Sequence, residues 1–99
     1  MSAKRVFVTG GNAGIGYALC KQLIVDHGCF VYMGARSTER GTNAIKSLIK
    51  EAPEASSQIE LIQIDTSSAE SVQAAAQSLA SKLDGNKLYA LVNNAGKIK

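Results

Sequence analysis

A glycine-rich run between a strand pattern and a helical pattern is the part of this sequence best suited to chemistry. The segment Thr9–Gly16 follows the β-branched run Arg5–Thr9 and opens a helix. Glycine permits a tight turn and lets backbone approach a pyrophosphate without a Cβ in the way. The helix start adds free N–H groups and a partial positive charge, so the segment predicts a phosphate site. Its residues are Gly10, Asn12, Gly14, Ile15 and Gly16.

The type of nucleotide follows from the residues at the end of the second strand pattern. A carboxylate about twenty residues after such a loop is typical of an NAD site, because it binds the ribose 2′-hydroxyl. Residues 32–38 contain no carboxylate, and the first one after them is Glu39. Arg36 and Ser37 stand there instead, and Arg40 offers a second charge. A guanidinium can bind a 2′-phosphate that a carboxylate would repel, so NADP(H) is predicted over NAD(H). The alternative is that Arg36 is a solvated loop residue.

A Lys-Ser/Thr ending is missing from the glycine loop, which argues against a nucleoside triphosphatase.

Two hydrophobic periodicities alternate along the chain, and each predicts one type of element. Short apolar or β-branched runs predict strands at Arg5–Thr9, Phe30–Met33, Ile59–Ile64 and Leu88–Val92. Apolar residues at helical spacing predict helix faces of Ile15, Ala18, Leu19 and Leu23, then of Ile45, Leu48, Ile49 and Ala52, then of Val72, Ala75, Ala76, Leu79 and Leu83.

Glycine, proline and serine positions predict where these elements begin and end. The expected helix ends are Gly28, Pro53 and Gly85, and the expected end of the second strand is Gly34. Ser67 and Glu70 have the spacing of a capping box ahead of the third helix. The polar segment Glu54–Gln58 is expected to be a loop and the most flexible part of the chain.

The alternation of strands and helices predicts an α/β fold with a parallel sheet and helices on both faces. Right-handed crossovers give the strand order 3-2-1-4, with a topological switch point between strands 1 and 4 where ligands bind. Residues 1–99 are therefore expected to form the N-terminal, cofactor-binding part of a single Rossmann-type domain, an incomplete doubly wound fold.

Three features in chain order resemble the short-chain dehydrogenases/reductases. The pattern Thr-Gly-x-x-x-Gly-x-Gly occurs at Thr9–Gly16, and Asn-Asn-Ala-Gly occurs at Asn93–Gly96 after the fourth strand pattern. Asp65 matches the acidic residue that touches the adenine ring in that family. The runs Val8–Gly16 and Ala35–Ser37 look most like the carbonyl-reductase branch.

The resemblance implies roles for residues outside the glycine loop. Asn93 would stabilise the end of the fourth strand, Ala95 and Gly96 would lie near the cofactor ribose, and Asp65 would contact adenine. The plain alternatives are an ordinary turn after a strand for the first three, and a first polar residue after a strand for Asp65.

The activity implied for a full-length enzyme is hydride transfer between NADPH and a carbonyl or alcohol substrate. The catalytic Ser, Tyr and Lys of the family would lie beyond position 99, so the chain alone is expected to be inactive. Tyr17 and Lys21 have the family's Tyr-x-x-x-Lys spacing, but they lie on the first helix and are interpreted as packing and solvated residues. Two alternatives are a non-catalytic dinucleotide-binding protein and a non-functional truncated remnant.

Composition limits the partners. The net charge of +3 and pI near 9.0 suit an anionic ligand, but the basic residues form no stripe, so no nucleic-acid partner is predicted. No signal peptide or membrane-length apolar run is present, and the expected location is cytoplasmic. Cys20 and Cys29 are expected to be buried thiols, without a metal site. An unpaired edge of the fourth strand is expected to permit self-association and to leave the isolated chain marginally stable.

Overall fold

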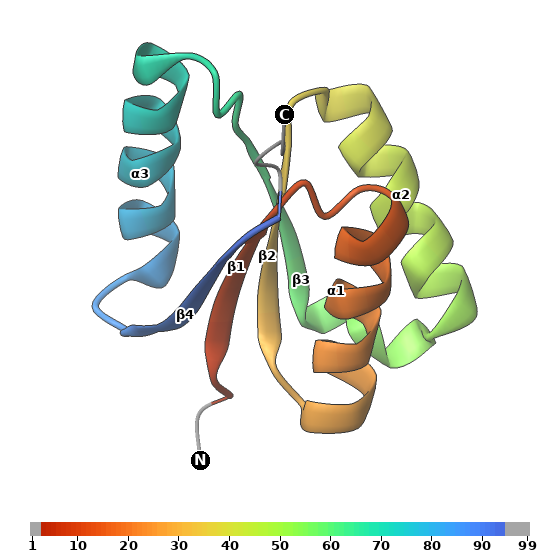
Figure 1. Cartoon of the computed structure of the whole chain (residues 1–99). Coiled ribbons are helices and arrows are strands. Elements are labelled where there is room, and N and C mark those ends of the chain that lie inside the picture. Colours follow the sequence, from red (N-terminus) through yellow and green to blue (C-terminus); the bar gives the residue numbers. More distant parts are fainter. Residues whose placement is uncertain (1–2, 95–99) are drawn as a thin grey trace.

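The computed structural model describes residues 3–94 and shows strands and helices in alternation. The elements in chain order are β1 (Arg5–Thr9), α1 (Gly14–His27), β2 (Phe30–Ala35), α2 (Thr38–Glu51), the 3-10 helix η1 (Pro53–Ser57), β3 (Ile59–Gln63), α3 (Ala69–Leu83) and β4 (Leu88–Asn93). Figure 1 shows one parallel sheet between helical layers. The predicted fold class is confirmed.

The strands run in the order β3-β2-β1-β4, and every pairing is parallel. Near the carboxyl edge of the sheet, Thr9 of β1 is paired with Gly34 of β2 on one side and with Asn93 of β4 on the other. The loops after these three strands therefore meet at one edge. This edge holds most of the residues singled out by the sequence.

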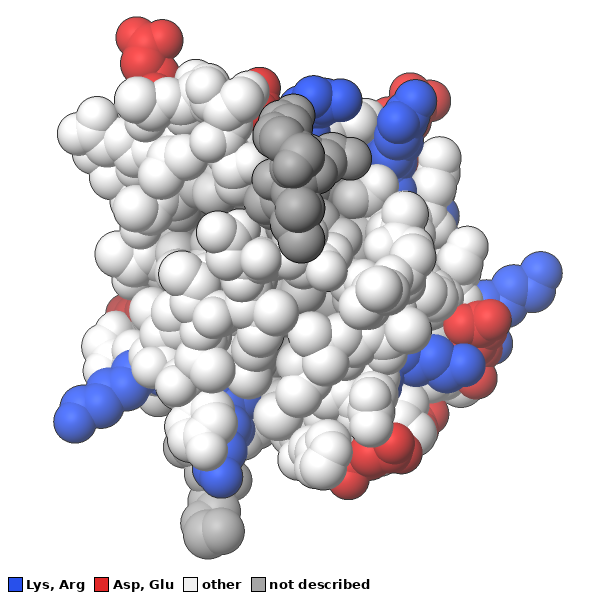
Figure 2. Space-filling model, in the orientation of Figure 1, with Lys and Arg blue, Asp and Glu red and all other residues white. Residues whose placement is uncertain are grey.

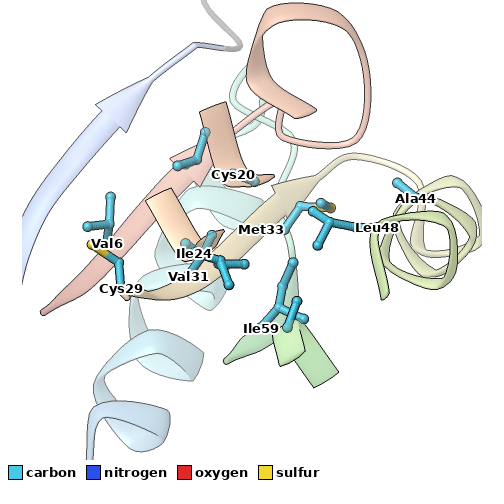
Figure 3. Close-up of a cluster of buried hydrophobic side chains, with 11 residues drawn as sticks. Val6, Cys20, Ile24, Cys29, Val31, Met33, Ala44, Leu48 and Ile59 are labelled. Atoms are coloured by element: carbon cyan, nitrogen blue, oxygen red, sulfur yellow. The ribbon is translucent and has the colours of Figure 1, made fainter. Parts of the chain in front are cut away.

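Helices cover both faces of the sheet, with α1 and α2 on one face and α3 on the other (Figure 1). Successive residues of β1 point to opposite faces, so Val8 packs toward α1 and α2 while Phe7 packs toward α3. The first core, much of which Figure 3 labels, comprises Val6, Val8, Cys20, Ile24, Cys29, Val31, Met33, Ala44, Leu48, Ala55 and Ile59. The second core comprises Phe7, Tyr32, Ile62, Ile64 and Ala75. Both cysteines are buried and free, as predicted.

The predicted face of α1 is wrong in phase. The helix buries Gly16, Cys20 and Ile24, whereas Ile15 is 81% exposed. Small residues at the first two of these positions let the helix lie close to the sheet. The predicted Leu19 and Leu23 are only partly buried against the first core and line a groove beside β4 with Ala90 and Val92.

Gly34 does not end the second strand but lies inside it. A Cβ at this position would lie 2.7 Å from Cε1 of Phe7 and 3.0 Å from Cγ2 of Ile64. The glycine is therefore explained by the close approach of neighbouring strands, and the strand continues to Ala35.

The predicted flexible loop Glu54–Gln58 is mostly part of η1. Ala55 is fully buried, its N–H donates to the carbonyl of Ala52, and the N–H of Gln58 donates to the carbonyl of Ala55. The buried Ala55 thus anchors a segment that was predicted to be flexible because its other residues are polar.

The ends of α3 also differ from the prediction. The N-cap is Ser68, whose Oγ accepts a hydrogen bond from the N–H of Ser71, and Ser67 turns away toward Asp65. At the other end, Asp84 takes the left-handed conformation (φ 48°) one residue before Gly85. A local carboxylate partner for Ser67 therefore displaced the expected cap by one residue.

None of the helices within residues 3–94 combines the length and the apolar content needed to cross a membrane.

Candidate functional site

The glycine loop after β1 is shaped by backbone conformation and by close packing. Gly10 and Gly14 have positive φ values of 65° and 57°, which side-chain-bearing residues rarely adopt. Gly11 donates its N–H to the carbonyl of Gly34 at 3.0 Å, and a Cβ on it would lie 2.9 Å from both Cys20 Sγ and Met33 Cγ. The loop is thereby tied to the end of β2.

Gly16 leaves room for a contact that ties the same loop to the end of β4. A Cβ on Gly16 would lie 2.2 Å from the carbonyl oxygen of Gly10 and 2.6 Å from Nδ2 of Asn94. Asn94 Nδ2 donates to that same Gly10 oxygen at 3.1 Å. Sequence reasoning missed Asn94, although the second asparagine of the Asn-Asn pair, directly after a strand, was a usable signal.

The start of α1 differs from the starts of the other two α-helices. Ser37 caps α2 and Ser68 caps α3, each accepting a hydrogen bond through its side-chain oxygen. The N-cap of α1 is Ala13, which makes no side-chain cap hydrogen bond, and the first turn of α1 contains no acidic residue. Its first-turn N–H groups are thus left without a side-chain acceptor within the described chain. Such a helix start is a site for an anion.

Thr9 and Asn93 join the carboxyl ends of β1 and β4. Thr9 Oγ1 donates toward Asn93 Oδ1 at 3.1 Å and toward the Val92 carbonyl at 3.3 Å. This places Asn93 at the end of β4, where the resemblance put it. Ala95 and Gly96 lie outside the described residues.

A polar pocket of about 480 Å³ lies between the glycine loop and the start of α2. Its lining is Asn12, Arg36, Ser37, Glu39 and Arg40. Arg36 is exposed, and within residues 3–94 no carboxylate oxygen lies close enough to form an ion pair with it. Ser37 also serves α2, because its Oγ accepts the N–H of Arg40 at 3.2 Å. The structure thus brings Asn12 of the glycine loop beside Arg36 and Ser37, which follow β2.

Asp65 follows β3 at the same edge and organises the turn before α3. Its Oδ1 accepts hydrogen bonds from the hydroxyl of Ser67 at 2.6 Å and from the N–H of Ser67 at 3.0 Å. These bonds, and more weakly the charge of Arg36, hold the pKa of the Asp65 carboxyl below its usual value. The carboxylate is therefore ionised at neutral pH.

Tyr17 and Lys21 both bind Glu51 of α2 and do not face the carboxyl edge. The hydroxyl of Tyr17 donates to Glu51 Oε1 at 2.8 Å, and Lys21 Nζ lies 3.4 Å from the same oxygen. Burial and the Glu51 carboxylate raise the pKa of Tyr17 to about 12. A tyrosine that exchanges protons in catalysis needs a pKa nearer neutrality, so this pair joins two helices. Lys21, predicted to be simply solvated, is in an ion pair.

The described surface around β4 carries little charge. In Figure 2 the charged side chains lie toward the margins, and an uncharged surface covers β4 and the space between α3 and α1. Tyr89 and Leu91 of β4 are 64% and 60% exposed. Within the described sheet, β4 pairs only with β1, so its outer edge is open, as predicted.

Comparisons with known proteins agree with this arrangement. A family model described as short chain dehydrogenase matches residues 4–99. A short-chain dehydrogenase/reductase of Aspergillus calidoustus is 43% identical over 96 residues, which are 97% of this chain and 29% of that protein. The structure of a menthone neomenthol reductase from Mentha piperita has a TM-score of 0.87 and 36% identity, covering 98% of this chain and 33% of that one. An NADPH-bound carbonyl reductase from chicken fatty liver has a TM-score of 0.79 and 26% identity, covering 100% and 36%. The chain thus spans well under half the length of these proteins.

Proposed function

The chain belongs to the short-chain dehydrogenase family, and from that premise we propose that it is the NADP(H)-binding part of an oxidoreductase that reduces a carbonyl group. The family membership supports dinucleotide binding in general. The choice of NADP(H), the substrate class and the residues in contact with the cofactor are the proposal.

The observation that carries the proposal is the uncapped start of α1. A serine side chain accepts one first-turn N–H in α2 and one in α3, but the start of α1 has only Ala13. Unsatisfied helix N–H groups next to glycine backbone fit a pyrophosphate, which has oxygen acceptors and negative charge. Gly14, Ile15 and Gly16 are the residues that would donate, and the 81% exposure of Ile15 agrees with an open helix start.

The preference for NADP(H) rests on the charge of the neighbouring pocket. Arg36 and Arg40 outnumber the single carboxylate of Glu39 there, and Asn12 adds an amide. A ribose 2′-phosphate would gain a charge-assisted hydrogen bond from a guanidinium, whereas a 2′-hydroxyl would gain little from it. The chicken carbonyl reductase, which covers all of this chain in the comparison, is described with NADPH bound.

NADPH, when bound, supplies the hydride for reduction of a carbonyl carbon. This chain's own contribution is binding and orientation: the glycine loop and α1 hold the pyrophosphate, and Arg36 and Ser37 hold the 2′-phosphate. Asp65, which is ionised, would accept a hydrogen bond from the adenine amino group. Asn93, fixed by Thr9, would keep the end of β4 beside the cofactor.

Calorimetric titration of the chain with NADPH and with NADH tests this proposal. Wild-type protein should bind NADPH more tightly, and Arg36→Asp should reverse the order by removing an attraction and adding a repulsion. One charge-assisted hydrogen bond corresponds to about a tenfold to hundredfold change in the ratio of dissociation constants. Lys46→Asp makes the same charge change on α2, outside the pocket, and should leave the ratio nearly unchanged.

Two results would contradict the proposal in different ways. Unchanged discrimination in Arg36→Asp would remove the reason for choosing NADP(H). Failure of the folded chain to bind either dinucleotide would reject the binding function itself and favour the non-functional remnant.

A further inference from the structure

Two glutamine side chains join β3 to the two ends of β2. Before β2, Gln58 Nε2 donates to the carbonyl of Cys29 at 3.1 Å. After β2, Gln63 Nε2 donates to the carbonyl of Arg36 at 3.0 Å. The bonds are chemically alike, but only the second one reaches a residue of the polar pocket.

Gln63 continues the pairing of β2 and β3 one residue past the end of the backbone ladder. The N–H of Ile64 donates to the carbonyl of Ala35 at 2.9 Å, which is the last main-chain bond between the two strands at this edge. The next carbonyl of that chain belongs to Arg36, and the side chain of Gln63 takes it. The residue after it, Ser37, is already the cap of α2.

Arg36 is therefore the one residue between a fixed strand end and a fixed helix start. The bond from Ile64 to the Ala35 carbonyl holds the peptide before the Arg36 Cα. The bond from Gln63 to the Arg36 carbonyl holds the peptide after it. Together they restrain the direction in which the Cα–Cβ bond of Arg36 leaves the backbone. The side chain itself is exposed and forms no ion pair within residues 3–94. Backbone fixation is thus the main restraint on where the guanidinium can reach, and it lowers the entropy lost when an anion is bound.

The restraint on the Arg36 backbone also matters because Asp65 is a competing anion for the Arg36 guanidinium. The charge of Arg36 already contributes to lowering the pKa of the Asp65 carboxyl. A freely rotating peptide at Arg36 would let the guanidinium move toward Asp65 and away from Asn12.

We propose that Gln63 is a positioning residue for selection of a 2′-phosphorylated dinucleotide, acting through the carbonyl of Arg36. The inference rests on the proposed function, because it assumes that Arg36 binds the 2′-phosphate. It predicts that Gln63 affects recognition of that phosphate and leaves recognition of the rest of the nucleotide intact.

The test compares two ligands that differ only in the 2′-phosphate, adenosine 2′,5′-bisphosphate and adenosine 5′-monophosphate. Their dissociation constants are measured by calorimetry for wild type, Gln63→Met, Gln58→Met and Arg36→Ala. Methionine keeps the length of glutamine but cannot donate a hydrogen bond. Gln58→Met is the matched control, because it removes the same kind of bond from the other end of β2, at a more buried position.

Gln63→Met should weaken bisphosphate binding about threefold to tenfold, the effect of one ordinary hydrogen bond, and leave monophosphate binding unchanged. Gln58→Met should change the ratio of the two dissociation constants by less than about twofold, even if it lowers the unfolding temperature as much as Gln63→Met does. Circular dichroism on each variant confirms that folded protein is compared.

Three results would overturn the inference. The first is that Gln63→Met has the same ratio of dissociation constants as wild type, while Arg36→Ala loses the preference for the bisphosphate. That result would reject the role of Gln63 and leave the proposed function intact. The second is an equal loss in Gln58→Met, which would assign the effect to general weakening of the sheet. The third is a wild-type protein with no preference for the bisphosphate, in which case the 2′-phosphate assignment fails together with the inference.

Discussion

Replacing Gly16 by alanine should destabilise the fold by adding one methyl group at the crossing of the loop and α1. The added Cβ would lie 2.2 Å from the carbonyl oxygen of Gly10, which is backbone and cannot move aside by a rotamer change. Overpacking of this kind costs about 1–3 kcal/mol. Displacing that carbonyl also weakens its bond from Asn94, worth about 1 kcal/mol, while alanine regains about 1 kcal/mol in helix propensity. The net loss is about 1–3 kcal/mol.

Thermal unfolding followed by circular dichroism measures the effect. In a domain of this size, a loss of 2 kcal/mol lowers the unfolding temperature by roughly 8–16 °C. Gly14 is the matched glycine, since its φ is +57° and a Cβ on it would meet nothing within 4 Å. Asparagine tolerates the left-handed conformation, so Gly14→Asn should be milder than Gly14→Ala. At Gly16, where space is the limit, asparagine should be worse than alanine.

The reasoning would be refuted by an unfolding temperature of Gly16→Ala within about 2 °C of wild type. It would also fail if adding Asn94→Ala restored the stability of Gly16→Ala. Rescue would mean that the asparagine side chain was the obstacle, whereas the geometry assigns the main clash to the Gly10 carbonyl.

Three further predictions concern a cap, a buried thiol and the sheet edge. Ser68→Ala should cost about 1 kcal/mol of unfolding free energy in denaturant titration, and Ser67→Ala less, because only Ser68 caps α3. A larger loss in Ser67→Ala would contradict this and would favour the capping box predicted at Ser67. Burial raises the pKa of Cys20 to about 12, above its ordinary value of 9.0. The contribution of Cys20 to the free energy of unfolding is therefore full below pH 9 and falls toward pH 12, because only the unfolded chain ionises in that range. Cys20→Ala should flatten this fall, and an unchanged slope would contradict the prediction. Leu91→Lys on β4 should reduce concentration-dependent association in analytical ultracentrifugation, whereas Val25→Lys on α1 should not; a monomeric wild type of ordinary stability would reject edge association.

The arrangement of the elements could be predicted because it depends on general rules. Alternating periodicities define strands and helices, and right-handed crossovers allow few strand orders. The order β3-β2-β1-β4 follows from these rules without knowledge of any single contact. The position of the glycine loop at the switch point between β1 and β4 follows as well.

Details that depend on one atom meeting another could not be predicted. The phase of α1 was wrong because the predicted face was drawn mainly from its large apolar residues, whereas the small residues Gly16 and Cys20 let the helix approach the sheet. The cap of α3 shifted to Ser68 because Ser67 had a nearer partner in Asp65. In each case a tertiary contact outweighed a local pattern.

The candidate site depends on β4 as much as on the loop that carries the phosphate-binding pattern. Gly11 fixes the loop to β2 through the Gly34 carbonyl, and Asn94 fixes it to the end of β4 through the Gly10 carbonyl. The Gly10 carbonyl and the Gly11 N–H belong to the same peptide group, so the two anchors hold a single peptide from the β2 side and from the β4 side of β1. The loop can therefore hold its shape only when strands from both ends of the chain are paired with β1. A pattern contained within residues 9–16 thus describes a site that the first half of the chain cannot form by itself.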